Sequence, residues 1–411
     1  MNIKRILPTA KPGLTLGVLL IFSSSIGQTY FISLFSGEIR NEFNLSHGIF
    51  GTFYSAATLT SAIVFFWMGK LTDQYNLTVL GLITLGVLSG LSFLISNAET
   101  LIILFLSLLG LRLFGQSMIS HIAVVAMARW FPQKKGQGLS IALMGHPIGE
   151  ALLPILVTLC LLHYNWREIW MGIGICIIII FFPLVYWLGR YLKLQQASSS
   201  NNNLPKTKNV LNVSWNRSQV LKDLRFYQIL PGLLASPFIV TGVFFHQIHL
   251  IETKSWSITL LASSYPFFAL SVVVATFFAG WIVDRFSTVH LLRFFLLPLA
   301  LGLLLIASTD KTYFAPIFMI LIGVSTGAAS IVVSTLWVEL YGIGYLGSIR
   351  SMCFSMIVLS TAMSPALIGI LLDIGISLRV QFIIFAIYSL ICSIIFIILT
   401  PKLLISQSPP S

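Results

Sequence analysis

Two charged residues lie deep inside long apolar stretches, Arg112 within 101–128 and Glu150 within 137–162. At about 1.5 Å of rise per helical residue, Arg112 is about 16 Å from the start of its stretch and Glu150 about 20 Å from the start of its own. A charge at the centre of a bilayer costs at least about 2.5–3.5 kcal/mol, so such a side chain usually faces a cavity and has a function. We expect the two to face each other or a shared water-filled cavity. A purely structural ion pair is the alternative.

A histidine accompanies the carboxyl group. His146 precedes Glu150 by four residues and therefore shares its helix face. A carboxyl group beside a histidine and an arginine can bind and release a proton near neutral pH, which is what proton coupling needs. In the other interpretation, His146 only hydrogen-bonds to a backbone carbonyl.

A second polar group is predicted nearer the outer membrane surface. His246 and His249 share a face by their i, i+3 spacing, with Gln247 between them. Substrate hydrogen bonding or gating is the favoured role, interfacial packing is the alternative, and a metal site would need more ligands. The other candidates are Gln28, Thr29 and Tyr30 in the first apolar stretch, Gln116 near Arg112, and the secondary residues His121, Tyr265, Ser334 and Trp337.

The elements that must position these residues are membrane helices. The chain of 411 residues is 57% hydrophobic and 9% charged, against about 25% charged residues in soluble domains. Apolar runs reach the roughly 20 residues that a spanning helix needs, and lipid leaves backbone groups no other partners. We predict an all-α integral membrane protein with twelve spans, near 14–36, 48–68, 78–96, 101–128, 137–162, 169–189, 227–250, 258–279, 289–308, 313–338, 349–371 and 380–399.

The basic residues orient this arrangement. With the N-terminus inside, the segments predicted to be cytoplasmic hold 18 Lys/Arg and 4 Asp/Glu, whereas the opposite side holds 5 and 7. This is the positive-inside asymmetry. It predicts a multi-pass protein of the cell inner membrane with both termini in the cytoplasm. It also explains the net charge of +12 without nucleic-acid binding.

The sequence contains an internal repeat. Gly69 to Asp73 and Gly280 to Asp284 have the same spacing, and the two copies are separated by 211 residues. The long polar stretch 191–226 has the composition of a linker. We therefore predict an N-terminal six-helix bundle (1–190), a cytoplasmic linker (191–226) and a C-terminal six-helix bundle (227–411).

At these residues the chain resembles the major facilitator superfamily over nearly its whole length. The resemblance implies two pseudo-symmetric bundles around a central cavity that holds one solute. It also implies a cytoplasmic gate motif in the loops between helices 2 and 3 and between helices 8 and 9. The candidate gate residues of the first half are Gly69, Asp73 and Arg129, with Arg129 as the candidate partner of the Asp73 carboxylate. Those of the second half are Gly280, Asp284, Arg285, Glu339 and Arg350, of which the last four are expected to form the equivalent ion cluster.

A narrower resemblance is to the monocarboxylate-transporter-like branch and its bacterial relatives. It is carried by Arg129–Gly138, by Asn165-Trp166-Arg167, which is similar to that branch's ending of helix 5, and by Gly347–Arg350 with Ser364-Pro365, Gly369 and Asp373. The lysine and helix 8 arginine of the carboxylate-binding members have no counterpart here, so the substrate class is not implied. Gly145–Gly149 partly resembles the helix 5 motif of antiporters, with His146 interrupting it.

These observations predict a secondary active transporter for a small organic solute, with Glu150 and His146 as the proton site and Arg112 as counter-charge or anion anchor. No phosphate-binding Gly-x-x-x-x-Gly-Lys-Ser/Thr motif occurs, so a gradient rather than ATP is expected to drive transport. We expect a monomer in the lipid bilayer, with protons and the solute as partners, no cofactor and no enzymatic activity. The alternatives are a proton-independent uniporter or exchanger and a non-transporting solute sensor.

Overall fold

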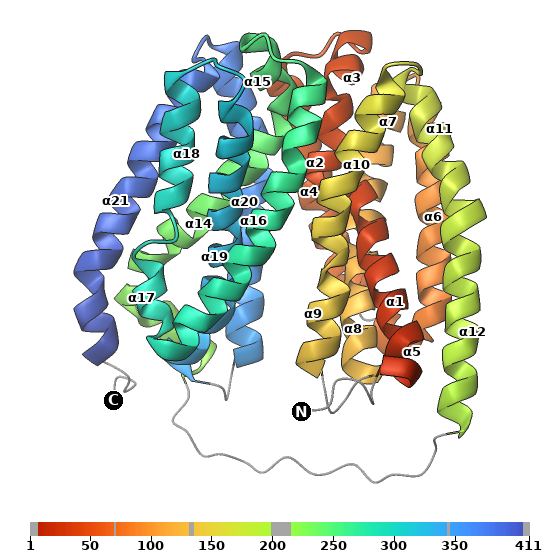
Figure 1. The fold of residues 1–411 in the computed structure, drawn as a ribbon, viewed down its shortest axis with the longest axis horizontal. Coiled ribbons are helices and arrows are strands. Elements are labelled where there is room, and N and C mark those ends of the chain that lie inside the picture. The colour runs from red at the N-terminus through yellow and green to blue at the C-terminus, as the bar shows by residue number, and fades with distance from the viewer. Residues whose placement is uncertain (1–6, 70, 131–134, 199–214, 343–345, 406–411) are drawn as a thin grey trace. The chain divides into compact units, whose positions relative to one another are not determined.

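The computed structural model describes residues 7–69, 71–130, 135–198, 215–342 and 346–405. Within these ranges all regular structure is helical (Figure 1). Eleven helices there are long and apolar enough to cross a membrane, and a bent pair at the start of the chain makes a twelfth span if its two parts count as one. This confirms the predicted all-helical membrane fold.

Residues 1–44 and 56–206 form the first of two compact units, here called unit 1. Its elements are α1 (Leu7–Ser24), η2 (Ser25–Gly27), α2 (Thr29–Ile32), η3 (Ser33–Phe35), α3 (Ser36–Glu42), most of α4 (His47–Met68), α5 (Leu71–Gln74), α6 (Leu77–Ser96), α7 (Leu101–Gly110), η4 (Leu111–Ile119), α8 (Ser120–Trp130), α9 (Lys135–Leu143), α10 (Gly145–Leu161), α11 (Trp166–Cys176), η5 (Ile177–Phe181) and α12 (Phe182–Ser198). The segments η2 and η3 are 3-10 helices, whereas η4 and η5 are π-helices.

Residues 45–55 and 207–411 form unit 2, so the first turns of α4 belong to this unit. Its other elements are α13 (Arg217–Lys222), α14 (Leu224–Phe245), α15 (Gln247–Thr253), α16 (Ile258–Arg285), α17 (Thr288–Leu292), α18 (Leu297–Ser308), α19 (Phe314–Tyr341), α20 (Leu346–Asp373) and α21 (Leu378–Ile405). We call the end of each unit opposite its chain terminus the distal end.

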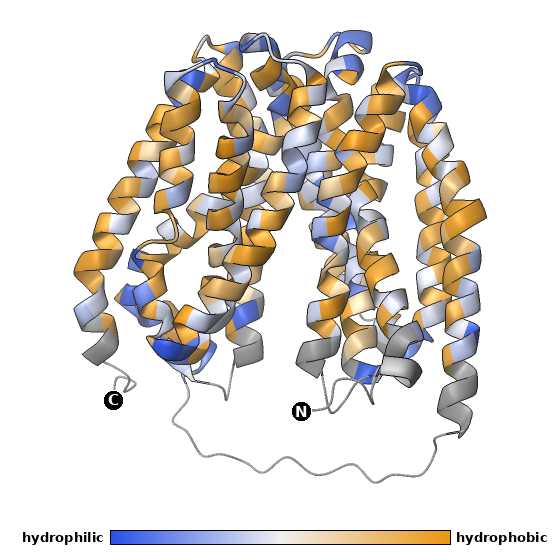
Figure 2. Cartoon of the chain, in the orientation of Figure 1, coloured by the Kyte–Doolittle hydropathy of each residue, from blue (hydrophilic) through white to orange (hydrophobic). Residues whose placement is uncertain are grey.

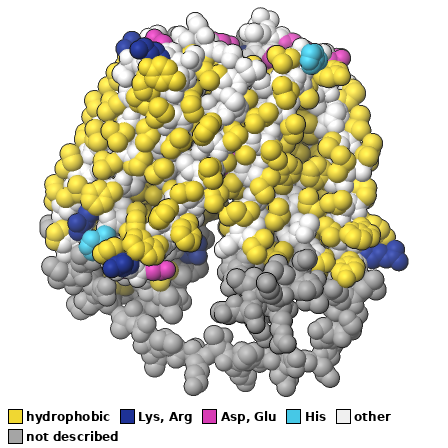
Figure 3. Space-filling model, in the orientation of Figure 1, with side chains coloured by type: hydrophobic (Ala, Val, Ile, Leu, Met, Phe, Trp, Pro, Cys, Tyr) yellow, Lys and Arg dark blue, Asp and Glu magenta, His cyan; other side chains and the backbone are white. Residues whose placement is uncertain are grey.

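Hydropathy varies along each helix in the same way. Hydrophobic residues dominate their middles and polar residues gather at their ends (Figure 2). On the face drawn in Figure 3, apolar side chains cover the helix flanks, and Lys, Arg, Asp and Glu lie near the ends. Large side chains such as Phe66 and Phe277 are each 73% exposed. Exposed aromatic residues in such numbers suit contact with lipid rather than with water.

The internal repeat extends into the helices. The seven-residue helices α3 and α15 begin at Ser36 and Gln247, and the longer helices α4 and α16 begin at His47 and Ile258. Both pairs are separated by 211 residues, the spacing of the repeated Gly–Asp motif. The repeat is thus a repeat of structure as well as of sequence.

The second copy of the repeated motif differs from the predicted loop. Gly280 to Arg285 is helical and forms the end of α16, which runs six residues beyond the predicted end of that span. The turn comes later, at Ser287, whose side chain accepts a hydrogen bond from the Val289 amide and caps α17. In unit 1 the matching residue, Asn76, caps α6 in the same way.

Part of the predicted linker is packed structure. The side chain of Asn216 caps α13, and the Trp215 amide donates to the Tyr341 carbonyl oxygen at 3.0 Å. The Tyr341 hydroxyl donates to Asp223, which also pairs with Arg225 at 2.9 Å. These contacts anchor the residues from Trp215 onward to the end of α19, so the second half begins before residue 227.

Each unit ties its distal loops together with one cation. In unit 1, Arg167 pairs with Glu42 and donates to the carbonyl oxygens of Ser96 and Ala98. Asn165-Trp166-Arg167 therefore begins α11, after the loop, rather than ending helix 5 as its resemblance implied.

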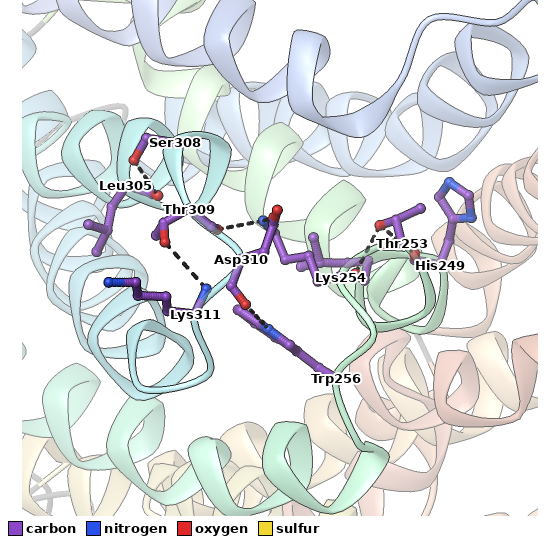
Figure 4. A network of polar contacts seen from close by, with 10 residues as sticks. His249, Thr253, Lys254, Trp256, Leu305, Ser308, Thr309, Asp310 and Lys311 are labelled. Atoms are coloured by element: carbon purple, nitrogen blue, oxygen red, sulfur yellow. Dashed lines mark hydrogen bonds and ion pairs between the residues drawn. The ribbon is translucent and has the colours of Figure 1, made fainter.

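In unit 2 the cation is Lys254. Its ammonium group lies 2.7 Å from the Asp310 carboxylate and 2.8 Å from the Thr309 carbonyl oxygen (Figure 4). The Trp256 indole donates to the Asp310 carbonyl oxygen at 2.6 Å. Residues 98 and 309 are again 211 apart, so the two clamps hold equivalent loops.

Candidate functional site

The first span is broken at mid-length. The α1 helix passes into the 3-10 turn η2, Gln28 is extended (φ −82°, ψ 152°), and the helix resumes at Thr29. The two parts are bent by 49°. A break inside a membrane leaves backbone carbonyl groups without helical partners, so other groups must satisfy them. Gly27 lets η4 approach closely, because a β-carbon there would lie 2.3 Å from the Leu111 carbonyl oxygen.

Arg112 supplies hydrogen bonds at this break. Its Nη1 donates to the Gly27 carbonyl oxygen at 3.0 Å and to Thr29 Oγ1 at 3.2 Å. Its Nε donates to Thr58 Oγ1 at 3.1 Å. The side chain is 1% exposed and lies in the π-helix η4, a form that is rare and often found at functional sites. Arg112 therefore ties η4 and α4 to the interrupted first span.

The helix α10, which carries Glu150 and His146, packs against the same region. A β-carbon at Gly149 would lie 2.2 Å from Ser25 Oγ and 3.1 Å from the Tyr30 hydroxyl oxygen. The α10 backbone thus contacts both sides of the break. Glu150 and His146 are half-buried within unit 1. The structure brings Gln28, Tyr30 and Gln116 to this break as well, since Gln116 lies beside Gly27 on η4.

Arg112 and Glu150 are not ion-paired among the described residues. The guanidinium instead donates to uncharged oxygens, and the Glu150 carboxyl group takes part in no hydrogen bond or ion pair within the described ranges. In the same place the Ser25 hydroxyl is buried without a hydrogen-bond partner in the part of the chain that the structure describes.

Unit 2 places its predicted polar residues at a second helix break, between α14 and α15. His246 is the residue between the two helices, and its Nε2 donates to the Pro365 carbonyl oxygen at 3.1 Å. Gln247 Oε1 accepts from the Tyr265 hydroxyl at 2.5 Å. His246 and Gln247 are 3% and 1% exposed. His249 lies one turn further on, with its ring against His47 at a centroid distance of 4.2 Å.

Three secondary candidates lie elsewhere. His121 contacts the first gate loop, with Nε2 3.2 Å from Thr72 Oγ1. Ser334 donates to a carbonyl oxygen of its own helix. Trp337 is buried and stacks on Tyr341 beside the anchored segment. These positions favour packing or gate support over contact with a solute.

The gate residues of the second half are arranged differently from the expected ion cluster. Glu339 accepts from the Ser287 hydroxyl and from the Thr288 amide at 2.8 Å, so it caps α17. Asp284, Arg285 and Arg350 are exposed, and no ion pair joins them in the described part of unit 2. Arg285 instead stacks over Trp281, with its guanidinium 5.6 Å from the ring centroid.

In the first half, the gate motif is only partly described. Gly69 follows the end of α4 and Arg129 is exposed at the end of α8. The side chain of Asp73 and residues 131–134 lie outside the described residues. The proposed contact between Asp73 and Arg129 therefore stays a prediction.

Two polar residues that matter were not singled out as site residues. Thr58 holds the Arg112 Nε, and Asp373 binds the first turn of α4. Thr58 carries no local signal, because hydroxyl groups are common in membrane helices. Asp373 could have been noticed as the lone acid at the end of its apolar stretch.

Comparisons with known proteins agree with this architecture. The family model of the Major Facilitator Superfamily matches residues 17–356, and the chain belongs to that superfamily. It is therefore a multi-pass membrane transporter of the superfamily. Among curated proteins, no sequence matches it significantly.

Solved structures of transporters share the fold. A bacterial homolog of the human lysosomal transporter Spinster, inward-facing and unoccupied, has a TM-score of 0.71 and 14% identity, covering 98% of this chain and 99% of that one. The nucleoside transporter NupG has a TM-score of 0.68 and 13% identity, covering 97% of this chain and 100% of that one. At such identities the likeness concerns the fold alone.

Proposed function

We propose that this chain is a secondary active transporter that moves a small organic solute by alternating access, coupled to protons at Glu150. The observation that carries the proposal is the position of Glu150: a carboxyl group within a membrane-spanning helix, with no cationic partner among the described residues, on a helix packed against the broken first span. The proposal continues the expectation drawn from the sequence, with a changed role for Arg112.

The chemistry follows from the cost of charge in a membrane. An ionised carboxylate without a counter-charge is costly there, whereas the protonated carboxylic acid is neutral. A carboxyl group in that position can therefore exchange a proton whenever its surroundings change between two transport states. His146, one helical turn away, is a second group that could share the proton.

Arg112 has a positioning role in this proposal. Its hydrogen bonds to Gly27, Thr29 and Thr58 use the guanidinium to hold the helix break open. Broken helices at mid-membrane are the elements that transporters use to present backbone groups to a solute. We propose that the solute binds at this break, beside Glu150 and Tyr30.

The test is transport in proteoliposomes with an imposed pH gradient, across a library of carboxylates, sugars, nucleosides and drugs. For any solute that the native protein accumulates, Glu150→Gln should abolish uphill accumulation and keep solute exchange, because a neutral amide cannot carry a proton. Glu99→Gln, the same change at an exposed loop residue, is the matched control and should accumulate solute normally.

If Glu150→Gln still accumulates solute uphill, the Glu150 carboxyl group is not the proton site. Exchange without any accumulation in the native protein would favour the proton-independent uniporter or exchanger. The finer placement belongs to the same proposal: a monomer of the cell inner membrane with both termini in the cytoplasm, related to the monocarboxylate-transporter-like branch. Impermeant labelling of a cysteine placed near either terminus tests the orientation.

A further inference from the structure

The first turns of α4 pack within unit 2, although the rest of that helix belongs to unit 1. The clearest contact is polar. The Asp373 carboxylate, at the end of α20, accepts from the Ser46 hydroxyl at 2.6 Å and from the Gly48 amide at 2.8 Å. Ser46 is itself the capping residue of α4, since its hydroxyl accepts from the Ile49 amide. A carboxylate from another helix thus completes the cap of α4.

This position suits a negative charge. The first amide groups of a helix lack helical acceptors, and the helix dipole makes this end attractive to anions. Hydrogen bonds to an ionised carboxylate are stronger than those between neutral groups. Asp373 is therefore a specific attachment point for residues 45–55.

Close backbone packing fits the two helices around this contact. A β-carbon at Gly51 would lie 2.3 Å from the Pro365 carbonyl oxygen, and one at Gly369 would lie 2.4 Å from the His47 carbonyl oxygen. Such spacing admits only glycine at these positions. The α4 segment therefore rests directly on the α20 backbone, with Asp373 at the end of the contact.

Aromatic rings hold the other side of the segment against α14 and α15. Phe50 and Tyr54 contact Phe245 at centroid distances of 5.4 and 4.7 Å, and His47 contacts His249 at 4.2 Å. These are contacts between rings. The Asp373 cap is the carboxylate contact of the attachment.

The internal repeat provides a comparison for this attachment. The helix equivalent to α4 is α16, and its capping residue Ser257 matches Ser46 at the spacing of 211. Ser257 caps α16 with its own side chain. The position that matches Asp373 is Leu162, which offers no carboxylate. Only one half of the described structure has this carboxylate cap.

We propose that Asp373 is a positioning residue of the transport cycle: its carboxylate holds residues 45–55 within unit 2 in one transport state and releases them in the other. This inference rests on the proposed function, because release matters only if the protein alternates between two states. The cap itself can be tested without any solute.

The first measurement is amide hydrogen exchange of the full-length protein in lipid nanodiscs. Asp373→Ala should speed exchange of residues 46–55 by about five- to tenfold, the usual effect of losing a helix cap. Asp373→Asn keeps a hydrogen-bond acceptor without the charge. Its amide exchange rate over residues 46–55 should lie between those of the native protein and Asp373→Ala. Exchange at the start of α16 should not change in either variant.

Asp310→Ala is the matched control, since it removes another distal carboxylate of unit 2 whose partner is Lys254. It should leave residues 46–55 protected. Ser46→Ala combined with Asp373→Ala should have less effect than the sum of the two single changes, because both remove the same contact. An unchanged rate of amide hydrogen exchange over residues 46–55 in Asp373→Ala would overturn the proposal.

The second measurement is solute exchange in proteoliposomes, with any solute that the native protein transports. Asp373→Ala should change the maximal rate by at least about threefold with little change in half-saturating concentration, because it alters the balance of states and not solute contacts. Faster amide exchange with an unaltered maximal rate would overturn the role in the cycle. If no solute is transported, the proposed function fails while the amide-exchange result still decides the cap.

Discussion

The two halves differ at their matched helices η4 and α19. Arg112 in η4 and Gly323 in α19 are 211 residues apart, the spacing of the internal repeat. The guanidinium of Arg112 meets three hydrogen-bond acceptors, one on α4 and two at the broken first span. Gly323 instead lets α16 pack against α19, since a β-carbon there would lie 2.6 Å from the Phe268 carbonyl oxygen.

This difference shows how one repeat serves two purposes. In unit 1 the buried charge coincides with a π-helix and an interrupted span, so backbone groups become available within the membrane. In unit 2 the glycine coincides with a regular 28-residue helix. In unit 2 the polar groups at the helix break are His246 and Gln247, whose described partners are the Pro365 carbonyl oxygen and the Tyr265 hydroxyl.

The largest expected effect comes from removing the guanidinium. Arg112→Ala removes the hydrogen bonds to the Gly27 carbonyl oxygen, Thr29 and Thr58, and a buried polar group left unsatisfied costs about 1–3 kcal/mol. We expect a loss of stability on the order of 3 kcal/mol and loss of transport. Arg112→Lys should be intermediate, because a single ammonium group cannot replace the planar fork of donors.

Thermal unfolding in detergent and transport in proteoliposomes measure these effects. Arg190→Ala removes an exposed arginine of α12 and serves as the control. If Arg112→Ala unfolds at the same temperature as the native protein, the guanidinium does not stabilise the helix break. The difference between the two halves would then make no contribution to stability.

A smaller effect is expected at the matched glycine. Gly323→Ala would force a methyl group against the Phe268 carbonyl oxygen and the Ser271 side chain. Overpacking of this kind costs about 1–3 kcal/mol. Gly86→Ala is the control, because nothing lies within 4 Å of the added atom there, and its effect should stay below about 1 kcal/mol. Equal unfolding temperatures for the two variants would contradict the close packing of α16 and α19.

The smallest effect concerns the two distal clamps. The hydrogen bond and charge of Lys254 lower the pKa of Asp310 below its usual value of 3.8. Because the folded-state pKa is the lower one, the pair contributes stability above the usual value and loses that contribution as pH falls through the folded-state pKa. The unfolding temperature of the native protein should therefore approach that of Lys254→Ala as pH is lowered from about 6 to about 3.

Asp310 is exposed, so the change should be slight and should fall further in high salt. Unfolding curves recorded over this pH range in a stable detergent provide the measurement. If the difference in unfolding temperature between the native protein and Lys254→Ala is instead the same at every pH, the Thr309 carbonyl oxygen, rather than the Asp310 charge, is the important partner of Lys254.

Much of the fold could be predicted because hydropathy and the repeat are local signals. They gave the helical class, the number of spans and the matched halves. The extended Gln28 has no proline beside it, so the break in the first span could not be read from the sequence. The continuation of α16 through Gly280 was missed because glycine and aspartate are turn residues in most contexts, whereas the helix here ends at Arg285.

Part of the candidate site could be predicted because charges within apolar stretches are also a local signal. Arg112 and Glu150 stood out as charges in apolar surroundings, and the structure places the elements that carry both against the broken first span. The partners of Arg112 were not predictable, because Thr58 and Gly27 are distant in sequence and carry no charge. The cap at Asp373 joins residues 325 positions apart, and no local pattern announces such a contact.

The anchored segment from Trp215 to Arg225 has a practical consequence for protein engineering. Because it is tied to the end of α19 through Tyr341 and Asp223, a fluorescent reporter or an epitope inserted just ahead of Trp215 would leave those ties intact. The same insertion at Val220, which is fully buried, would have to break them. The usable junction between the two halves therefore stops at Trp215, about a dozen residues before the hydrophobic profile alone would place it.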